Sequence, residues 1–183
     1  MKKNLMTLAA VFCCAMMTSM FTSCTKDDNV DPTPADDTKP VAGIMNYSLT
    51  VGDDMVNYLD LTIEYYDAAG KVQSEQMTQK TWTKKVKAAL PAKLGMRLNL
   101  KLKNGVDPST IAKFTESYTY AFEVYPVNKS EKMLEGGKGG SSSITLSIGG
   151  DKLAEWAEDH AKGLTKCLYV IDAEGKLSSA KWE

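Results

Sequence analysis

The 183-residue sequence predicts an all-β domain of two packed antiparallel sheets, a β-sandwich, with one short helix near residues 151–162. Two observations carry this prediction. Apolar and polar residues alternate with a period of two in several segments, which is typical of strands with one face in a core and one in water. Two nearly identical turn sequences, at 67–71 and 172–176, join further candidate strands into hairpins.

The alternation is clearest in residues 94–103, where leucine or methionine occupies every second position from Leu94 to Leu102. The polar residues that point the other way are Arg97, Asn99, Lys101 and Lys103. A polar residue that alternates with apolar ones points away from the core, so each such segment is expected to be a half-buried strand. The other segments with this pattern are 44–51, 57–66, 117–125 and 144–148.

Asp67 and Asp172 each open a turn that closes with Gly and Lys. Aspartate favours this position because its carboxylate accepts hydrogen bonds from the following backbone, and glycine supplies the positive φ at the end of the turn. Each turn therefore predicts a β-hairpin. The strands that these turns pair are 57–66 with 72–78, and 166–171 with 177–182.

The strongest helical signal covers residues 151–162. Asp151 is expected to cap the helix, an apolar stripe ends at His160, and Gly163 is expected to stop it. A weaker signal predicts a short helix that begins at Asp107-Pro108 and runs through Phe114. A closed, lipocalin-like β-barrel is the alternative architecture, because both folds are all-β and only strand pairing separates them.

The chain divides into three zones of different composition. Residues 1–23 join two lysines to a long uncharged apolar run, which predicts a secretory signal peptide rather than a permanent membrane span. Residues 24–40 are acidic, rich in proline and without apolar periodicity, and are expected to form an extended tether. Residues 41–183 carry equal numbers of basic and acidic residues and predict a single folded domain, whose neutrality argues against a nucleic-acid partner.

The leader ends in Phe21-Thr22-Ser23-Cys24, which resembles the lipobox of bacterial lipoproteins. In that family the cysteine sulfur takes a diacylglycerol and becomes the new N-terminus after cleavage. Thr22 and Ser23 supply the narrow side chains that the leader peptidase requires, whereas Phe21 replaces the leucine usual in proteobacteria. The resemblance implies lipidation of Cys24 and attachment to a membrane. Plain secretion, with Cys24 left free, is the alternative.

Lys26-Asp27-Asp28 follows the cysteine and is similar to the export signal of Bacteroidetes surface lipoproteins. This resemblance implies an outer-membrane lipoprotein displayed at the cell surface. The periplasmic face is the alternative, since charge-rich linkers are common. The domain itself resembles the small immunoglobulin-like domains that such lipoproteins carry, an analogy of fold alone.

The sequence favours neither an enzyme nor a metal or cofactor site. His160 is the only histidine and belongs to an apolar helical stripe, and Cys167 lies in an apolar strand where a buried, inert thiol is expected. The glycine-rich segment 136–143 lacks the Ser or Thr that a phosphate loop needs after Lys138, and is expected to be a flexible connection.

Aromatic residues are the remaining candidates for ligand binding. Tyr66 and Tyr125 fall on the polar side of their strands, and Trp82 stands among threonines and lysines, so these three are expected to be exposed. Core or rim packing is their alternative role. The sequence thus predicts a non-enzymatic module that binds an outer-membrane or extracellular protein, with a glycan-binding lipoprotein as the alternative.

Overall fold

The computed structural model describes residues 35–182, so the predicted signal peptide, Cys24 and most of the predicted tether lie outside the described residues. The described elements are mainly strands. The strands are β1 (Ala42–Val51), β2 (Leu59–Tyr66), β3 (Val72–Gln76), β4 (Thr81–Ala89), β5 (Ala92–Leu102), β6 (Lys113–Val127), β7 (Lys138–Gly149), β8 (Lys162–Ile171) and β9 (Leu177–Ser179). The helices are α1 (Asp53–Tyr58), α2 (Leu153–Asp159) and three 3-10 turns, η1 (Ala35–Thr38), η2 (Pro108–Thr110) and η3 (Gly150–Lys152).

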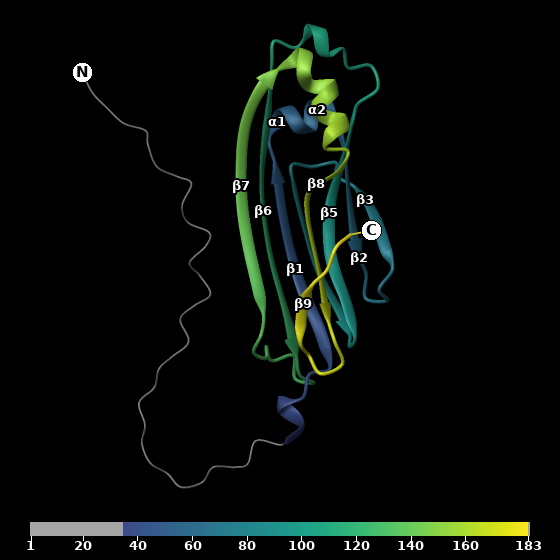
Figure 1. Ribbon diagram of the computed structural model, residues 1–183, viewed down its shortest axis with the longest axis vertical. Coiled ribbons are helices and arrows are strands. Elements are labelled where there is room, and N and C mark those ends of the chain that lie inside the picture. Colours follow the sequence, from purple (N-terminus) through teal and green to yellow (C-terminus); the bar gives the residue numbers. More distant parts are fainter. Residues whose placement is uncertain (1–34, 183) are drawn as a thin grey trace, which may run out of the picture. The chain divides into compact units, whose positions relative to one another are not determined.

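The strands form two antiparallel sheets (Figure 1). The first has the strand order β4-β1-β6-β7 and the second the order β3-β2-β5-β8-β9. Buried apolar side chains from both sheets form one core cluster between them. The predicted two-sheet sandwich is therefore confirmed. The lipocalin-like barrel is wrong, because the two sheets do not close on each other within residues 35–182.

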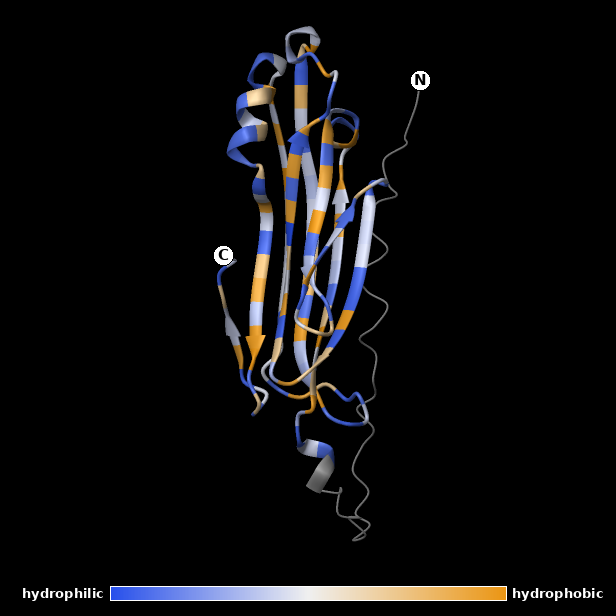
Figure 2. Cartoon of the chain, turned by 90° about the vertical axis from the view of Figure 1, so that its right-hand side faces the viewer, coloured by the Kyte–Doolittle hydropathy of each residue, from blue (hydrophilic) through white to orange (hydrophobic). Residues whose placement is uncertain are grey.

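The core depends on strands β1 and β5, which lie inside their sheets with a partner on each side. In β5, Leu94 and Leu98 are completely buried, whereas Arg97 between them is half-buried on the opposite face. Figure 2 shows this alternation as orange and blue bands along the strands. Replacing a fully buried leucine by alanine costs about 2–5 kcal/mol, so the alternation determines which face of the strand turns inward.

Both predicted hairpins are present. The Asp67 carboxylate accepts hydrogen bonds from the backbone N–H groups of Ala69 and Lys71, each at 2.9 Å, and β2 pairs with β3. The Asp172 carboxylate does the same for Lys176 at 2.8 Å, and β8 pairs with β9. The glycines of the two turns have φ angles of 72° and 83°. The aspartate–glycine chemistry of the sequence therefore sets both turns.

The helix predicted at 151–162 is shorter than expected. Asp151 lies inside η3 instead of capping a helix, and α2 ends at Asp159. It ends there because the chain enters β8 at Lys162, which pairs with Asn99 of β5. Gly163, the predicted stop, lies within β8 with a φ of 104°.

The helix predicted from Asp107 through Phe114 is wrong beyond its first turn. Only η2 forms, and the Asp107 carboxylate caps it by accepting a hydrogen bond from the Ser109 N–H at 3.0 Å. Phe114 belongs to β6 and is completely buried. Its burial against the helical end of the sandwich, where it contacts Trp156 and Tyr58, outweighs the local helical signal.

The glycine-rich segment 136–143 is not the flexible connection that was predicted, because most of it forms the first half of β7, paired with β6. Gly140 lies against the ring of Phe122. A Cβ atom at position 140 would come within 2.9 Å of that ring. Close packing, rather than flexibility, is therefore the reason for glycine at this position.

Three further elements, η1, α1 and β4, have no counterpart in the sequence prediction, and η1 forms a helical turn within residues 24–40, which were expected to be extended. Helix α1 joins β1 to β2 and buries Met55. Strand β4 turns Val86 and Ala88 into the core, while Lys85 and Lys87 lie on its exposed face. No helix in residues 35–182 is long and apolar enough to cross a membrane.

Candidate functional site

Strand β7 forms an unprotected edge of the first sheet. It is 12 residues long and pairs with β6, and within the described residues no strand pairs with its other side. From Gly139 to Gly149 it carries no charged side chain and no proline. An edge strand offers backbone N–H and C=O groups to any incoming chain, and natural proteins normally block such edges with charge, proline or short length.

The other three sheet edges in residues 35–182 have such protection. Strand β9 has 3 residues, and strand β3 has 5 residues with a glutamate among them. Strand β4 is longer but carries Lys84, Lys85 and Lys87. Lysines on an edge strand repel a second lysine-bearing edge and keep the strand solvated. Among the described edges, β7 is therefore the one built to accept a strand.

The two faces of β7 differ in chemistry. On the outer face, hydroxyl groups continue from β6 to β7, with Thr119 and Ser143 at 2.9 Å and Ser117 and Thr145 at 3.5 Å. The inner face carries apolar side chains that the second sheet does not fully cover. Ile144 is 37% exposed and Leu146 is 51% exposed.

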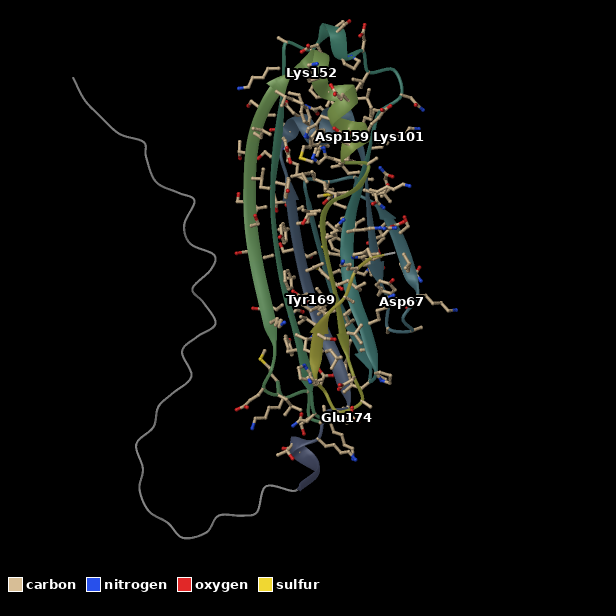
Figure 3. All side chains as sticks on the ribbon, viewed as in Figure 1. Asp67, Lys101, Lys152, Asp159, Tyr169 and Glu174 are labelled. Carbon is tan, nitrogen blue, oxygen red and sulfur yellow. The ribbon has the colours of Figure 1, made fainter. Side chains whose placement is uncertain are left out.

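The apolar surface continues from β7 onto β6 and β8. Tyr118 and Tyr120 of β6 stack with ring centroids 6.4 Å apart, and Phe122 packs on Tyr169 of β8 at 5.4 Å. Tyr169 is labelled in Figure 3. Tyr120, Phe122 and Tyr169 are half-buried, so parts of their rings face solvent. We call the partly exposed apolar residues along this side the open-edge strip. Its members are Tyr120, Phe122, Ile144, Leu146, Ile148 and Tyr169.

Tyr118 lies on the inner face of β6 beside the open-edge strip, opposite Ile144, and is only 5% exposed. Burial raises the pKa of its hydroxyl, and the neighbouring carboxylate of Glu116 adds to this effect. The tyrosine is therefore neutral across the physiological pH range. The aromatic rings beside the strip are thus uncharged, whereas Glu116, which pairs with Leu146 across the two strands, places one buried carboxylate on the same face.

A polar cluster closes the opposite side of the sandwich. The Glu75 carboxylate of β3 accepts hydrogen bonds from the Tyr65 hydroxyl at 2.6 Å, the Trp82 indole at 2.8 Å and the Lys84 ammonium group. We call these four residues the Glu75 clamp. They join β2 and β3 of one sheet to β4 of the other. The three donors lower the pKa of Glu75 to about 2, with Lys84 the largest contributor.

The structure does not bring Tyr66, Trp82 and Tyr125 together. Tyr66 was expected to be exposed. This prediction is wrong, because Tyr66 is only 8% exposed. It is covered by Trp182 of the C-terminal segment, whose ring centre lies 4.9 Å away. Trp82 belongs to the Glu75 clamp at the edge of the core. Tyr125 lies on the outer face of the first sheet, where its hydroxyl accepts a hydrogen bond from Asn46 at 3.4 Å.

The other residues considered for chemistry have structural contacts. His160 stacks on Trp156 at 4.7 Å, and its Nδ1 lies 2.7 Å from the Trp156 carbonyl. Burial raises the pKa of the Cys167 thiol to about 11, so the reactive thiolate is scarce at neutral pH. Residues 35–182 contain no group of three His, Cys, Asp or Glu side chains placed to hold a metal ion.

A shallow groove of about 230 Å³ lies between α2 and β5. Its lining includes the apolar Leu100, Leu102 and Ala157 and the charged Lys101 and Glu158. Figure 3 labels Lys101 beside α2. The groove is smaller than the roughly 300–1,000 Å³ typical of small-molecule sites, so the β7 edge remains the stronger candidate.

Comparison with known proteins gives no further guide: the chain matches no protein-family model, no curated protein and no solved structure.

Proposed function

We propose that this chain is a lipid-anchored, non-enzymatic protein-binding module of the outer membrane. The lipobox-like sequence at Cys24 supports the anchor. The β7 edge, which is uncharged over residues 139–149 and unpaired within the described residues, supports binding of a protein strand. The edge is the observation that carries the proposal. A partner strand that pairs with β7 would satisfy its free backbone groups and would place its own side chains beside Ile144 and Leu146 of the open-edge strip.

The start of the domain supports display of the sandwich from a tether. The Asn128 side chain is completely buried and donates to the Asp37 carbonyl at 2.5 Å and to its carboxylate at 3.0 Å. Ser130 donates to the same carboxylate at 3.0 Å. These bonds hold η1 against the loop that follows β6, at the end of the sandwich away from α1 and α2 (Figure 1). About ten residues separate Cys24 from η1, and they reach at most about 35 Å.

Cell-surface display, rather than exposure to the periplasm, is part of this proposal and rests on Lys26-Asp27-Asp28.

The glycan-binding alternative depended on Tyr66, Trp82 and Tyr125 acting together. These residues lie on separate surfaces, and Tyr66 is buried, so the described residues offer that alternative no shared platform.

The test is cross-linking in intact cells, followed by recovery of the full-length chain through a C-terminal tag. Wild type is compared with Leu146→Lys, which places a charge on the β7 edge, and with Val72→Lys as the matched control. Val72 is an apolar residue on edge strand β3 and is 47% exposed, close to the exposure of Leu146.

We expect wild type and Val72→Lys to recover the same cross-linked partner, and Leu146→Lys to lose at least nine-tenths of it. Leu146 is half exposed in the described chain, so lysine is tolerated there and the fold is retained. Undiminished recovery of the partner by Leu146→Lys would contradict the proposal.

A further inference from the structure

We infer that the strand received by the β7 edge is the β7 strand of a second copy of this chain, paired antiparallel across a two-fold axis centred on Leu146. This inference rests on the proposed function, because it names the occupant of the same edge. It follows from three observations: the side chains of β7 match their own reversed copy, residues 139–149 carry no charge, and the remaining described edges are protected.

The side chains of β7 match their own reversed copy. In an antiparallel pair related by a two-fold axis normal to the sheet, the inner face of one strand continues the inner face of the other. With Leu146 opposite itself, Ile144 lies opposite Ile148 of the second copy, so all three apolar residues of the inner face meet apolar residues. On the outer face, Thr145 lies opposite Ser147. No other centre on β7 pairs all three apolar residues with one another.

This register places the most exposed apolar residue of β7 at the centre of the contact. Leu146 is 51% exposed and Ile144 is 37% exposed in the single chain, and each would pack against an apolar neighbour in the pair. The hydroxyl contacts that already run from β6 to β7 on the outer face would extend to the second copy. Cross-strand apolar and Thr–Ser pairs of this kind stabilise antiparallel sheets.

Charge favours the same occupant. Because residues 139–149 carry no ionisable side chain, two copies of this segment meet without like-charge repulsion. An acidic or basic partner strand would gain no ion pair from residues 139–149. A second β7 strand has the neutrality, the length and the alternation of apolar and hydroxyl residues that the edge requires.

Pairing through β7 also limits the assembly to two copies. The contact is self-complementary, so it uses the β7 edge of both chains at once. The joined sheet would have β4 at each of its ends, and β4 carries Lys84, Lys85 and Lys87. These lysines discourage addition of further strands, so a closed dimer rather than a fibre is expected.

The test uses Leu146→Cys in the full-length chain, in isolated membranes. Under mild oxidation, cysteines that face each other across an antiparallel pair lie within disulfide distance, at roughly 4.5–5.5 Å between Cα atoms. We expect most of the chain to shift to twice its mass on a non-reducing gel. Ile144→Cys is the register control, because its two copies would lie roughly 14 Å apart and form no disulfide. Val72→Cys controls for chance collision of exposed thiols.

A benzophenone maleimide attached to the same Leu146→Cys chain separates failure of this inference from failure of the proposed function. A photo-adduct at twice the chain mass supports self-pairing. An adduct with a different protein overturns self-pairing and leaves the protein-binding function standing. The absence of any adduct overturns both self-pairing and the protein-binding function. In the disulfide experiment, a disulfide formed by Ile144→Cys but not by Leu146→Cys overturns the register and with it the matched pairing.

Discussion

Replacing Glu75 by glutamine tests whether the Glu75 clamp holds one side of the sandwich closed. One carboxylate oxygen accepts from both Tyr65 and Lys84, and the other accepts from the Trp82 indole. Glutamine has a single acceptor oxygen, so at least one donor faces an amide N–H₂ group and loses its bond. The ion pair with Lys84 is lost as well.

The expected loss in the free energy of unfolding follows from the number of these hydrogen bonds and from their exposure to solvent. A hydrogen bond to a charged group contributes about 1.5–3 kcal/mol, and an exposed ion pair contributes about 0–1 kcal/mol. The Glu75 side chain is 36% exposed, so solvent screening places the total near the lower end, at about 2 kcal/mol. For a domain of this size the melting temperature should fall by roughly 4–8 °C at pH 7.

The effect of Glu75→Gln should depend on pH. The pKa of Glu75 is lowered in the folded chain from 4.5 to about 2, so the unfolded chain binds the proton more readily. The contribution of the ionised carboxylate to the free energy of unfolding is therefore present in full above about pH 4.5. It is lost as the pH falls from 4.5 toward 2. The difference in melting temperature between wild type and Glu75→Gln should shrink over the same interval.

Thermal unfolding followed by circular dichroism from pH 7 to pH 3 measures both effects. Glu123→Gln is the matched control, because Glu123 is exposed on the outer face of β6, and its melting temperature should stay within about 1 °C of wild type. If Glu75→Gln also melts within 1 °C of wild type at pH 7, the clamp does not stabilise the closed side and the reasoning fails.

Three further predictions concern the anchor, the end of the tether and the covered aromatic residue. Cys24→Ser should move the chain from the membrane fraction to the soluble fraction, and its retention in membranes would contradict the proposed anchor. Asn128→Ala should lower the free energy of unfolding by about 2–3 kcal/mol in urea titrations, because the Asp37 carbonyl and the Lys132 N–H lose a buried partner. Trp182→Ala should uncover Tyr66 and increase its reaction with tetranitromethane several-fold, and an unchanged rate would show that Trp182 does not cover it.

The sequence predicted the parts of the fold that local chemistry determines. Two features could be predicted from neighbouring residues alone: the alternation in β5 and the aspartate–glycine turns at 67–71 and 172–176. Strand periodicity and turn hydrogen bonds both depend on residues that are close in the sequence. The two-sheet sandwich followed from these signals. Strand β4 was missed because Lys84 points inward to Glu75, which breaks the expected pattern of apolar residues inside and charged residues outside.

The candidate site was harder to predict because it depends on contacts between distant segments. Tyr66 stands on the polar side of β2, but the C-terminal segment brings Trp182 over it, and no local pattern signals this cover. The first half of β7 is rich in glycine and serine, which strands usually avoid. It becomes a strand because the long β6 offers a partner for each residue from Lys138 to Gly149. The absence of charge from 139 to 149 was visible in the sequence and is the signal that could have marked this edge.

Amide hydrogen exchange of β7 in native membranes tests the central claim most directly, since it reports whether any strand occupies the edge. In an unpaired edge strand about half of the amides point to solvent and exchange rapidly, whereas a bound strand protects them. We predict that a peptide covering 139–149 is protected in wild type and loses that protection in Leu146→Lys, while a peptide covering β3 exchanges equally in both. Equal, rapid exchange of the 139–149 peptide in the two proteins would show that the edge is empty and would contradict the account.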